Sequence, residues 1–164
     1  MVYRSPAVAA WNIWLIPVMF TTSGFMTGCG LIFLNTQIFA RAADLPVMIS
    51  LICILLNLAV WLVYLYGYRN ADFRKATQAM RQFGSLAVTV GAGHLLPLVL
   101  LLFITIYMEF ENGSQLPRIL GLVSGLAVIL GGVSQKTGII LKSGYFRSIV
   151  LNPVKEKGQV TFSS

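Results

Sequence analysis

Residues 46–68, PVMISLICILLNLAVWLVYLYGY, contain no charged side chain and form one continuous apolar run. A transmembrane helix needs about 20 predominantly apolar residues to cross roughly 30 Å of hydrocarbon. Pro46 stands at the first helical position, where its missing N–H group costs nothing. This stretch therefore predicts a helix that spans a lipid bilayer.

Three more stretches meet the same length requirement, and the segments between them are short and polar. They run over Trp11–Leu34, Phe83–Met108 and Pro117–Leu141. We therefore predict an all-α integral membrane protein built as a bundle of four transmembrane helices. Its expected parts are an N-terminal segment (1–9), the bundle (10–141) and a cytoplasmic tail (142–164).

The composition supports the same class of protein. Of the 164 residues, 57% are hydrophobic and only 10% are charged, and the mean hydropathy is +0.79. Soluble domains carry roughly 25% charged residues, so this sequence does not predict one. The net charge of +7 does not indicate nucleic-acid binding, because the basic residues fall in the loops and the tail.

The basic residues are distributed unequally between the two ends of the predicted bundle. Two of them, Arg41 and Arg118, fall on one side, and Lys136 falls inside the last helix. The other side carries Arg4, Arg69, Arg74, Lys75, Arg81, Lys142, Arg147, Lys155 and Lys157. Loops rich in Lys and Arg stay in the cytoplasm. We therefore expect both termini in the cytoplasm and a multi-pass protein of the inner (cytoplasmic) membrane.

Aromatic and small residues refine this picture. Trp and Tyr are enriched at membrane–water interfaces, so we expect Trp11, Trp14 and Tyr64 to act as interface anchors. Glycines spaced four apart allow helix backbones to approach closely. Two such pairs predict tight packing within the bundle, Gly24 with Gly28 and Gly121 with Gly125.

Four polar residues occur at membrane depth. These are Asn57, His94, Gln135 and Lys136, and polar groups in hydrocarbon usually face protein or water. Their estimated depths place them in one layer, as a hydrated half-channel or the polar end of a quinone pocket. Histidine suits a proton relay because its ordinary pKa is near neutrality. In the alternative interpretation, Lys136 extends to the surface and the other three only join helices.

The sequence lacks the patterns of an independent enzyme or a metal protein. It contains no Walker loop, no HExxH motif and no paired carboxylates within the predicted helices. Cys29, Cys53 and the single histidine do not form the ligand set of an iron–sulfur cluster, a c-type haem or a bis-histidine haem. We therefore predict no catalytic residue, no metal site and no cofactor held by this chain alone.

Two segments resemble a known family of membrane subunits. Residues 5–28, SPAVAAWNIWLIPVMFTTSGFMTG, are similar to the start of the second half of NrfD/PsrC-type (polysulfide reductase-like) subunits. Residues 121–144, GLVSGLAVILGGVSQKTGIILKSG, are similar to the last helix of that family, and Lys136 stands where the family usually has arginine. DmsC-type anchors show a looser version of both segments. The chain resembles the C-terminal four-helix half of such subunits.

This resemblance implies a membrane anchor subunit of a quinone-linked respiratory oxidoreductase. The implied partners are an iron–sulfur electron-transfer subunit, a molybdopterin-type catalytic subunit and a separate first four-helix bundle. Electrons would be exchanged with menaquinone or ubiquinone in the surrounding lipid. Because the quinone pocket of such families lies mainly in the first bundle, this chain is expected to supply scaffold and a proton path.

Two other functions remain open at this stage. One is a small transporter or channel that works alone as an oligomer. The other is a purely structural assembly subunit without chemistry of its own. The transporter predicts transport by the purified protein, whereas the structural subunit predicts that conservative changes at the buried polar positions leave turnover of the complex unchanged.

Overall fold

The computed structural model describes residues 10–11, 13–35, 44–110 and 115–143. The α-helices in these ranges are α1 (Leu15–Leu34), α3 (Asp44–Tyr66), α4 (Ala71–Ala76), α5 (Phe83–Leu86), α6 (Leu96–Phe110) and α7 (Leu116–Thr137). A 3-10 turn, η1, covers Gln78–Arg81, and two π-helical segments are η2 (Ala87–Leu95) and η3 (Gly138–Lys142). Within the described part of the chain, no β-strand interrupts this all-helical architecture.

Four continuous helices are long and apolar enough to cross a membrane, as the sequence predicts. They cover Leu15–Leu34, Leu45–Tyr66, Phe83–Ile106 and Leu116–Lys142. The third joins α5, η2 and α6, and the fourth joins α7 and η3. The predicted N-terminal segment (1–9) and residues 144–164 of the predicted tail lie outside the described residues.

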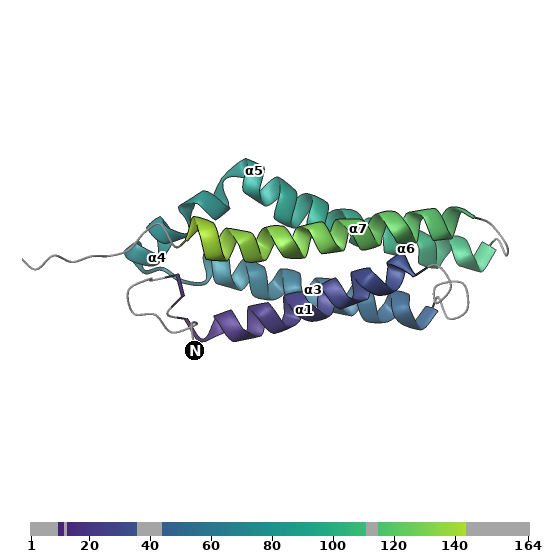
Figure 1. Ribbon diagram of the computed structural model, residues 1–164, viewed down its shortest axis with the longest axis horizontal. Helices are drawn as coiled ribbons and strands as arrows, with labels where there is room; N and C mark the ends of the chain where they lie inside the picture. Colours follow the sequence, from purple (N-terminus) through teal and green to yellow (C-terminus); the bar gives the residue numbers. More distant parts are fainter. Residues whose placement is uncertain (1–9, 12, 36–43, 111–114, 144–164) are drawn as a thin grey trace, which may run out of the picture.

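The four long helices run alternately up and down along one axis (Figure 1). The start of α1, the short helix α4 and the end of the fourth span therefore meet at one end of the bundle. Helix α7 packs along α1 on one side and along η2 and α6 on the other, while α3 packs mainly against α1.

Glycines set the close approach of α7 to its two neighbours. A Cβ atom on Gly93 would lie 2.5 Å from the Cα of Gly131, so these two backbones touch. A Cβ atom on Gly125 would lie 2.7 Å from the carbonyl oxygen of Gly30. The prediction of tight glycine packing is therefore confirmed at Gly125.

The other glycine pair, on α1, lies elsewhere. Nothing lies within 4 Å of a Cβ atom placed on Gly24 or Gly28. The face of α1 that packs inside the bundle carries Met19, Met26 and Gly30. The two glycines lie on the opposite face of the helix. The prediction that Gly24 and Gly28 pack inside the bundle is therefore wrong.

The third span is locally widened into a π-helix before Pro97. Proline lacks the N–H group for a helical hydrogen bond, and its ring clashes with the carbonyl four residues earlier. In η2 the backbone N–H of Leu96 donates to Gly91, five residues earlier, so the ladder is already shifted when the chain reaches Pro97. Such π-segments are rare and often lie at functional sites.

The connection between the second and third spans is folded into α4 and η1. The Asn70 side chain caps α4 by accepting a hydrogen bond from the backbone N–H of Asp72 (2.9 Å). Phe73 and Met80 are buried against the end of the bundle. The polar loop predicted here therefore forms a helical cover over one end of the apolar core.

The buried apolar side chains form two separate clusters along the bundle axis. One cluster contains Trp61 and Tyr64 and includes the cover formed by α4 and η1. The other contains Phe33, Leu101 and Val128, towards the opposite end. The polar side chains described next lie between these clusters.

Candidate functional site

A layer of buried polar side chains separates the two apolar clusters. Thr22, Asn57, His94 and Gln135 come from α1, α3, η2 and α7, so each of the four spans contributes one residue. Thr22 is 8% exposed and the other three are 0% exposed. Asn57 and His94 lie near the middle of their spans. The structure thus brings together three of the four polar residues that the sequence singled out.

Asn57 connects all the other members of the layer. Its Nδ2 atom lies 3.0 Å from Nε2 of His94, 3.0 Å from Oε1 of Gln135 and 3.3 Å from Sδ of Met26. Its Oδ1 atom accepts a hydrogen bond from the Thr22 hydroxyl (3.0 Å). One amide therefore links four helices, which is a common use of polar side chains inside membranes.

The π-helical segment fixes the orientation of His94. Nδ1 of the ring lies 2.6 Å from the backbone carbonyl oxygen of Thr89, five residues earlier. A carbonyl only accepts, so Nδ1 carries the proton and Nε2 of the neutral ring is left as an acceptor for Asn57. The imidazole is thus held at both nitrogens, in one tautomer.

Two polar atoms beside this layer have no hydrogen-bond partner among the described residues. They are Nε2 of Gln135 and Oγ of Ser23, and both are buried. The Ser23 hydroxyl lies 3.5 Å from the Cβ position of Gly132, one helical turn from Gln135. Buried polar groups without partners are costly, so this side of the layer is less well satisfied than the side around Asn57.

Lys136 does not join the layer. It is half-buried, and among the described residues it makes no hydrogen bond to Asn57, His94 or Gln135. Consecutive residues on an α-helix are turned by about 100°, so Gln135 and its neighbour cannot face the same point. Lys136 therefore lies next to the layer along the helix axis but on a different face of α7.

The three predicted interface anchors have different surroundings. Trp14 is 66% exposed, so its ring is accessible to the surroundings of the bundle. Trp11 is half-buried, and its Nε1–H group donates to the carbonyl oxygen of Ile139 (3.0 Å) and to the Ser143 hydroxyl (3.1 Å). These bonds connect the segment before α1 to the end of the fourth span.

Tyr64 differs most from the expectation, because it is fully buried and does not face lipid. Its hydroxyl donates to the carbonyl oxygen of Ala10 (3.2 Å), and its ring stacks on Trp61 at 5.6 Å between centroids. Phe73 contacts the same ring edge-on. The α4 cover encloses Tyr64, and no pattern in the sequence indicated this cover.

Sequence reasoning missed three contributors to the site, namely Thr22, Met26 and the Thr89 carbonyl. Threonine is common in transmembrane helices and usually bonds to its own backbone, as Thr27 does to Ser23. The spacing of Thr22 and Met26 on one face of α1 is the signal that was available. The Thr89 carbonyl reaches His94 because η2 is a π-helix, and no residue pattern indicated that this segment is π-helical.

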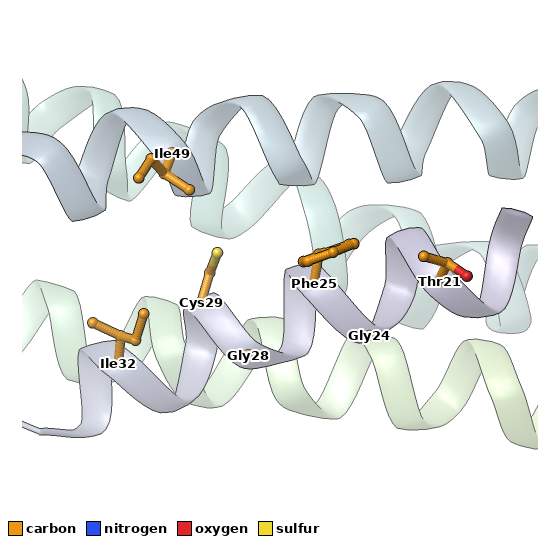
Figure 2. Close-up of a pocket in the computed structure, with 7 residues that line it drawn as sticks. All are labelled: Thr21, Gly24, Phe25, Gly28, Cys29, Ile32 and Ile49. Carbon is orange, nitrogen blue, oxygen red and sulfur yellow. The ribbon is translucent and has the colours of Figure 1, made fainter.

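A groove on the bundle surface is separate from this site. It has a volume of about 620 Å³ and lies between α1 and α3. Figure 2 shows that Gly24 and Gly28 leave the α1 backbone bare there, between the side chains of Thr21, Phe25, Cys29, Ile32 and, from α3, Ile49. The groove is almost entirely apolar, and none of the central polar side chains lines it.

The fold and the site define a class, a multi-pass membrane protein with a neutral hydrogen-bonded layer at the centre of a four-helix bundle. Among the described residues, no group of three His, Cys, Asp or Glu side chains is arranged to hold a metal ion. Comparisons with protein-family models, curated proteins and solved structures found no match to this chain. The resemblance to NrfD/PsrC-type subunits therefore stays an expectation from the two sequence segments.

Proposed function

We propose that this chain is a membrane anchor subunit of a quinone-linked oxidoreductase complex, in which the central polar layer serves a proton path. The observation that carries the proposal is a histidine at the middle of a span, hydrogen-bonded to Asn57 of a neighbouring helix. Ionisable residues at this depth are costly and are most often functional. The two family-like segments supply the quinone-linked part of the proposal.

The burial of the layer favours protons over a quinone ring as its cargo. Asn57, His94 and Gln135 are 0% exposed, so a ring reaches them only if the helices separate. A proton needs only a chain of donors and acceptors. Iron–sulfur and molybdopterin groups would be held by partner subunits, and the quinone would bind mainly outside this bundle.

The layer has a second hydrogen-bond arrangement available when His94 takes up a proton. Nε2 then becomes a donor, and the Asn57 amide must rotate so that Oδ1 faces the ring. Thr22 allows this, because the carbonyl oxygen of Met19, 3.2 Å away, accepts its hydroxyl hydrogen while Oγ1 accepts from Asn57. Rotation of Gln135 brings its unpaired Nε2 to Oδ1. Thr22, Asn57, His94 and Gln135 then each keep a partner, and only the contact of Nδ2 with the Met26 sulfur is lost.

The complex itself is tested by isolating the tagged full chain in mild detergent, with mass spectrometry of its partners and a metal assay. Co-purified iron–sulfur and molybdopterin subunits are the expected result. A metal-free homo-oligomer contradicts the proposal and favours the transporter that works alone.

The proton path is tested with His94→Gln in the assembled complex. Glutamine keeps a donor for the Thr89 carbonyl but cannot take up a proton, so the complex should assemble while quinone-linked turnover falls at least tenfold. The control is Ser124→Ala, which changes a buried serine of α7 whose hydroxyl has no hydrogen-bond partner among the described residues. Equal turnover in both variants would leave this chain with a structural role only.

A further inference from the structure

The two cysteines of the chain lie next to each other on neighbouring helices. Cys29 is on α1 and Cys53 is on α3, and both are free thiols. Their side chains interact through a hydrogen bond. Figure 2 shows the Cys29 thiol directed at α3. The fold therefore brings together two thiols that no sequence pattern connects.

The up-and-down arrangement of α1 and α3 makes the two side chains lean towards each other. At 1.5 Å per residue, Cys29 lies roughly 8 Å from the end of its span at Leu34, and Cys53 roughly 12 Å from the start of its span at Leu45. Cα–Cβ bonds in a helix tilt towards its N-terminus, so the deeper Cys53 leans towards the surface and Cys29 leans into the membrane. A disulfide requires Cα atoms within about 7 Å and Cβ atoms that point towards each other, and this lean meets the second requirement.

The apolar groove between α1 and α3 gives access to this pair from the lipid. Cys29 is one of its lining residues, and so is Ile49, which lies one helical turn from Cys53. The α1 backbone is bare in the groove at Gly24 and Gly28 (Figure 2). Charged molecules are strongly disfavoured in apolar surroundings, so a reactant that arrives here is neutral and lipid-soluble.

The same surroundings restrict how the thiols are oxidised. The usual reactive form of cysteine is the thiolate, and an apolar environment disfavours its charge. A suitable oxidant must therefore accept the protons together with the electrons. Quinones have this property, because their ring takes two electrons while their two carbonyl oxygens take two protons. They are also neutral, planar and soluble in lipid.

We propose that Cys29 and Cys53 are a redox-active pair that a quinone dissolved in the bilayer oxidises to an interhelical disulfide. The S–H group of Cys29 adds across a quinone carbonyl, so a sulfur–carbon bond forms and the proton goes to the oxygen. The Cys53 sulfur then attacks the Cys29 sulfur. The S–S bond forms, the sulfur–carbon bond breaks, and its electron pair and the Cys53 proton pass to the ring, which leaves as hydroquinone.

The overall reaction converts two thiols and one quinone into one disulfide and one hydroquinone. The new bond fixes α1 to α3 in the half of the bundle that lies away from the α4 cover. This chemistry is independent of the proposed function, because it uses no residue of the central polar layer.

The test uses the purified full-length chain, reduced and then reconstituted in liposomes under anaerobic conditions. A low protein-to-lipid ratio keeps the chains apart. Decylubiquinone serves as the oxidant, since its fully substituted ring has no free position for a lasting thiol adduct. We expect the intact mass to fall by two hydrogens and one hydroquinone to form per chain, whereas the anion ferricyanide should oxidise the pair poorly. No disulfide with decylubiquinone, or equally fast oxidation by ferricyanide, would overturn the proposal.

Substitutions connect the reaction to the pair and to the groove. Cys29→Ala and Cys53→Ala should each abolish hydroquinone formation, because one thiol cannot close a disulfide within the chain. Gly28→Leu fills the groove but keeps both thiols, so it should slow the oxidation about tenfold and covers the case that an alanine variant does not fold.

Gly84→Leu is the matched control for the groove variant. A Cβ atom on Gly84 also meets nothing within 4 Å, and this residue lies on α5, outside the groove. The control should be oxidised at the native rate. Hydroquinone formation by either alanine variant, or equal rates for Gly28→Leu and Gly84→Leu, would contradict the proposal.

Discussion

Asn57 is the residue on which the central layer depends. Its Nδ2 group has two hydrogens and three neighbouring acceptors, on Met26, His94 and Gln135. Its Oδ1 atom accepts a hydrogen bond from the Thr22 hydroxyl. Because these bonds reach three other helices, Asn57 fixes how the helices are placed relative to one another as well as which nitrogen of His94 is available.

Replacing Asn57 should show how much its hydrogen bonds contribute to the stability of the bundle. Asn57→Leu keeps the branching and the number of side-chain heavy atoms but removes the bonds to Thr22, His94 and Gln135. Interhelical hydrogen bonds in membrane proteins contribute about 0.6 kcal/mol each on average, so we expect the free energy of unfolding to fall by about 2 kcal/mol. Reversible unfolding in mixed micelles measures this quantity.

Ser124→Ala is the matched control for this measurement. Ser124 is equally buried in α7, and its hydroxyl has no partner among the described residues. Its replacement should leave the free energy of unfolding nearly unchanged. An Asn57→Leu variant as stable as this control would mean that the hydrogen bonds of the layer contribute nothing to the fold.

From the sequence, the position of the site could be predicted along the helix axis but not around it. Asn57, His94 and Gln135 were recognised because a polar side chain in hydrocarbon needs a partner. Depth does not specify the direction in which a side chain points, and Lys136 therefore joined the predicted layer although it turns away from it. Thr22 was missed for the opposite reason, since a threonine that satisfies its own backbone looks the same in sequence as one that bonds to a neighbouring helix.

At the scale of helices, the backbone contacts of α7 organise the bundle. Gly125 and Gly131 bring it against α1 and η2, respectively, and the bulkier side chains then fill the two apolar clusters around these contacts. Apolar length predicted most bounds of the four spans, but the first begins at Leu15 and not at Trp11. The partner of each glycine was not, because a small-residue pair shows that a close approach is feasible but does not say which helix approaches.

Two glycine substitutions should therefore have different effects on stability. Gly131→Ala places a Cβ atom 2.3 Å from the Cα of Gly93, so α7 and η2 must move apart. We expect a loss of about 1–3 kcal/mol in the free energy of unfolding, as for other overpacked interiors. Gly28→Ala meets nothing within 4 Å and should be neutral.

The same unfolding assay compares the two variants in the isolated chain. A neutral Gly131→Ala would contradict the α7–η2 contact. A strongly destabilised Gly28→Ala would show that the bare face of α1 is packed, which contradicts the arrangement in Figure 2.

For the whole molecule, an even number of spans brings the beginning and the end of the bundle to one end. Trp11 bonds to Ile139 there, and the α4 cover closes over the same region. The sequence predicted this alternation, but it described the segment between the second and third spans as a polar loop. Its folding into α4 and η1 depends on Phe73 and Met80 meeting the bundle, a tertiary contact that local composition does not reveal.

The charges at the two ends of the bundle predict its orientation in the membrane, and this prediction can be tested without altering them. Gln78 in η1 and Gln115 before α7 are exposed at opposite ends of the bundle. In a background without Cys29 and Cys53, Gln115→Cys should react with a membrane-impermeant maleimide in intact cells. Gln78→Cys should react only after permeabilisation, because the end rich in Lys and Arg is retained in the cytoplasm. Denatured samples of both variants control for reactivity. The reverse pattern would place the α4 cover, Arg81 and both ends of the bundle outside the cytoplasm.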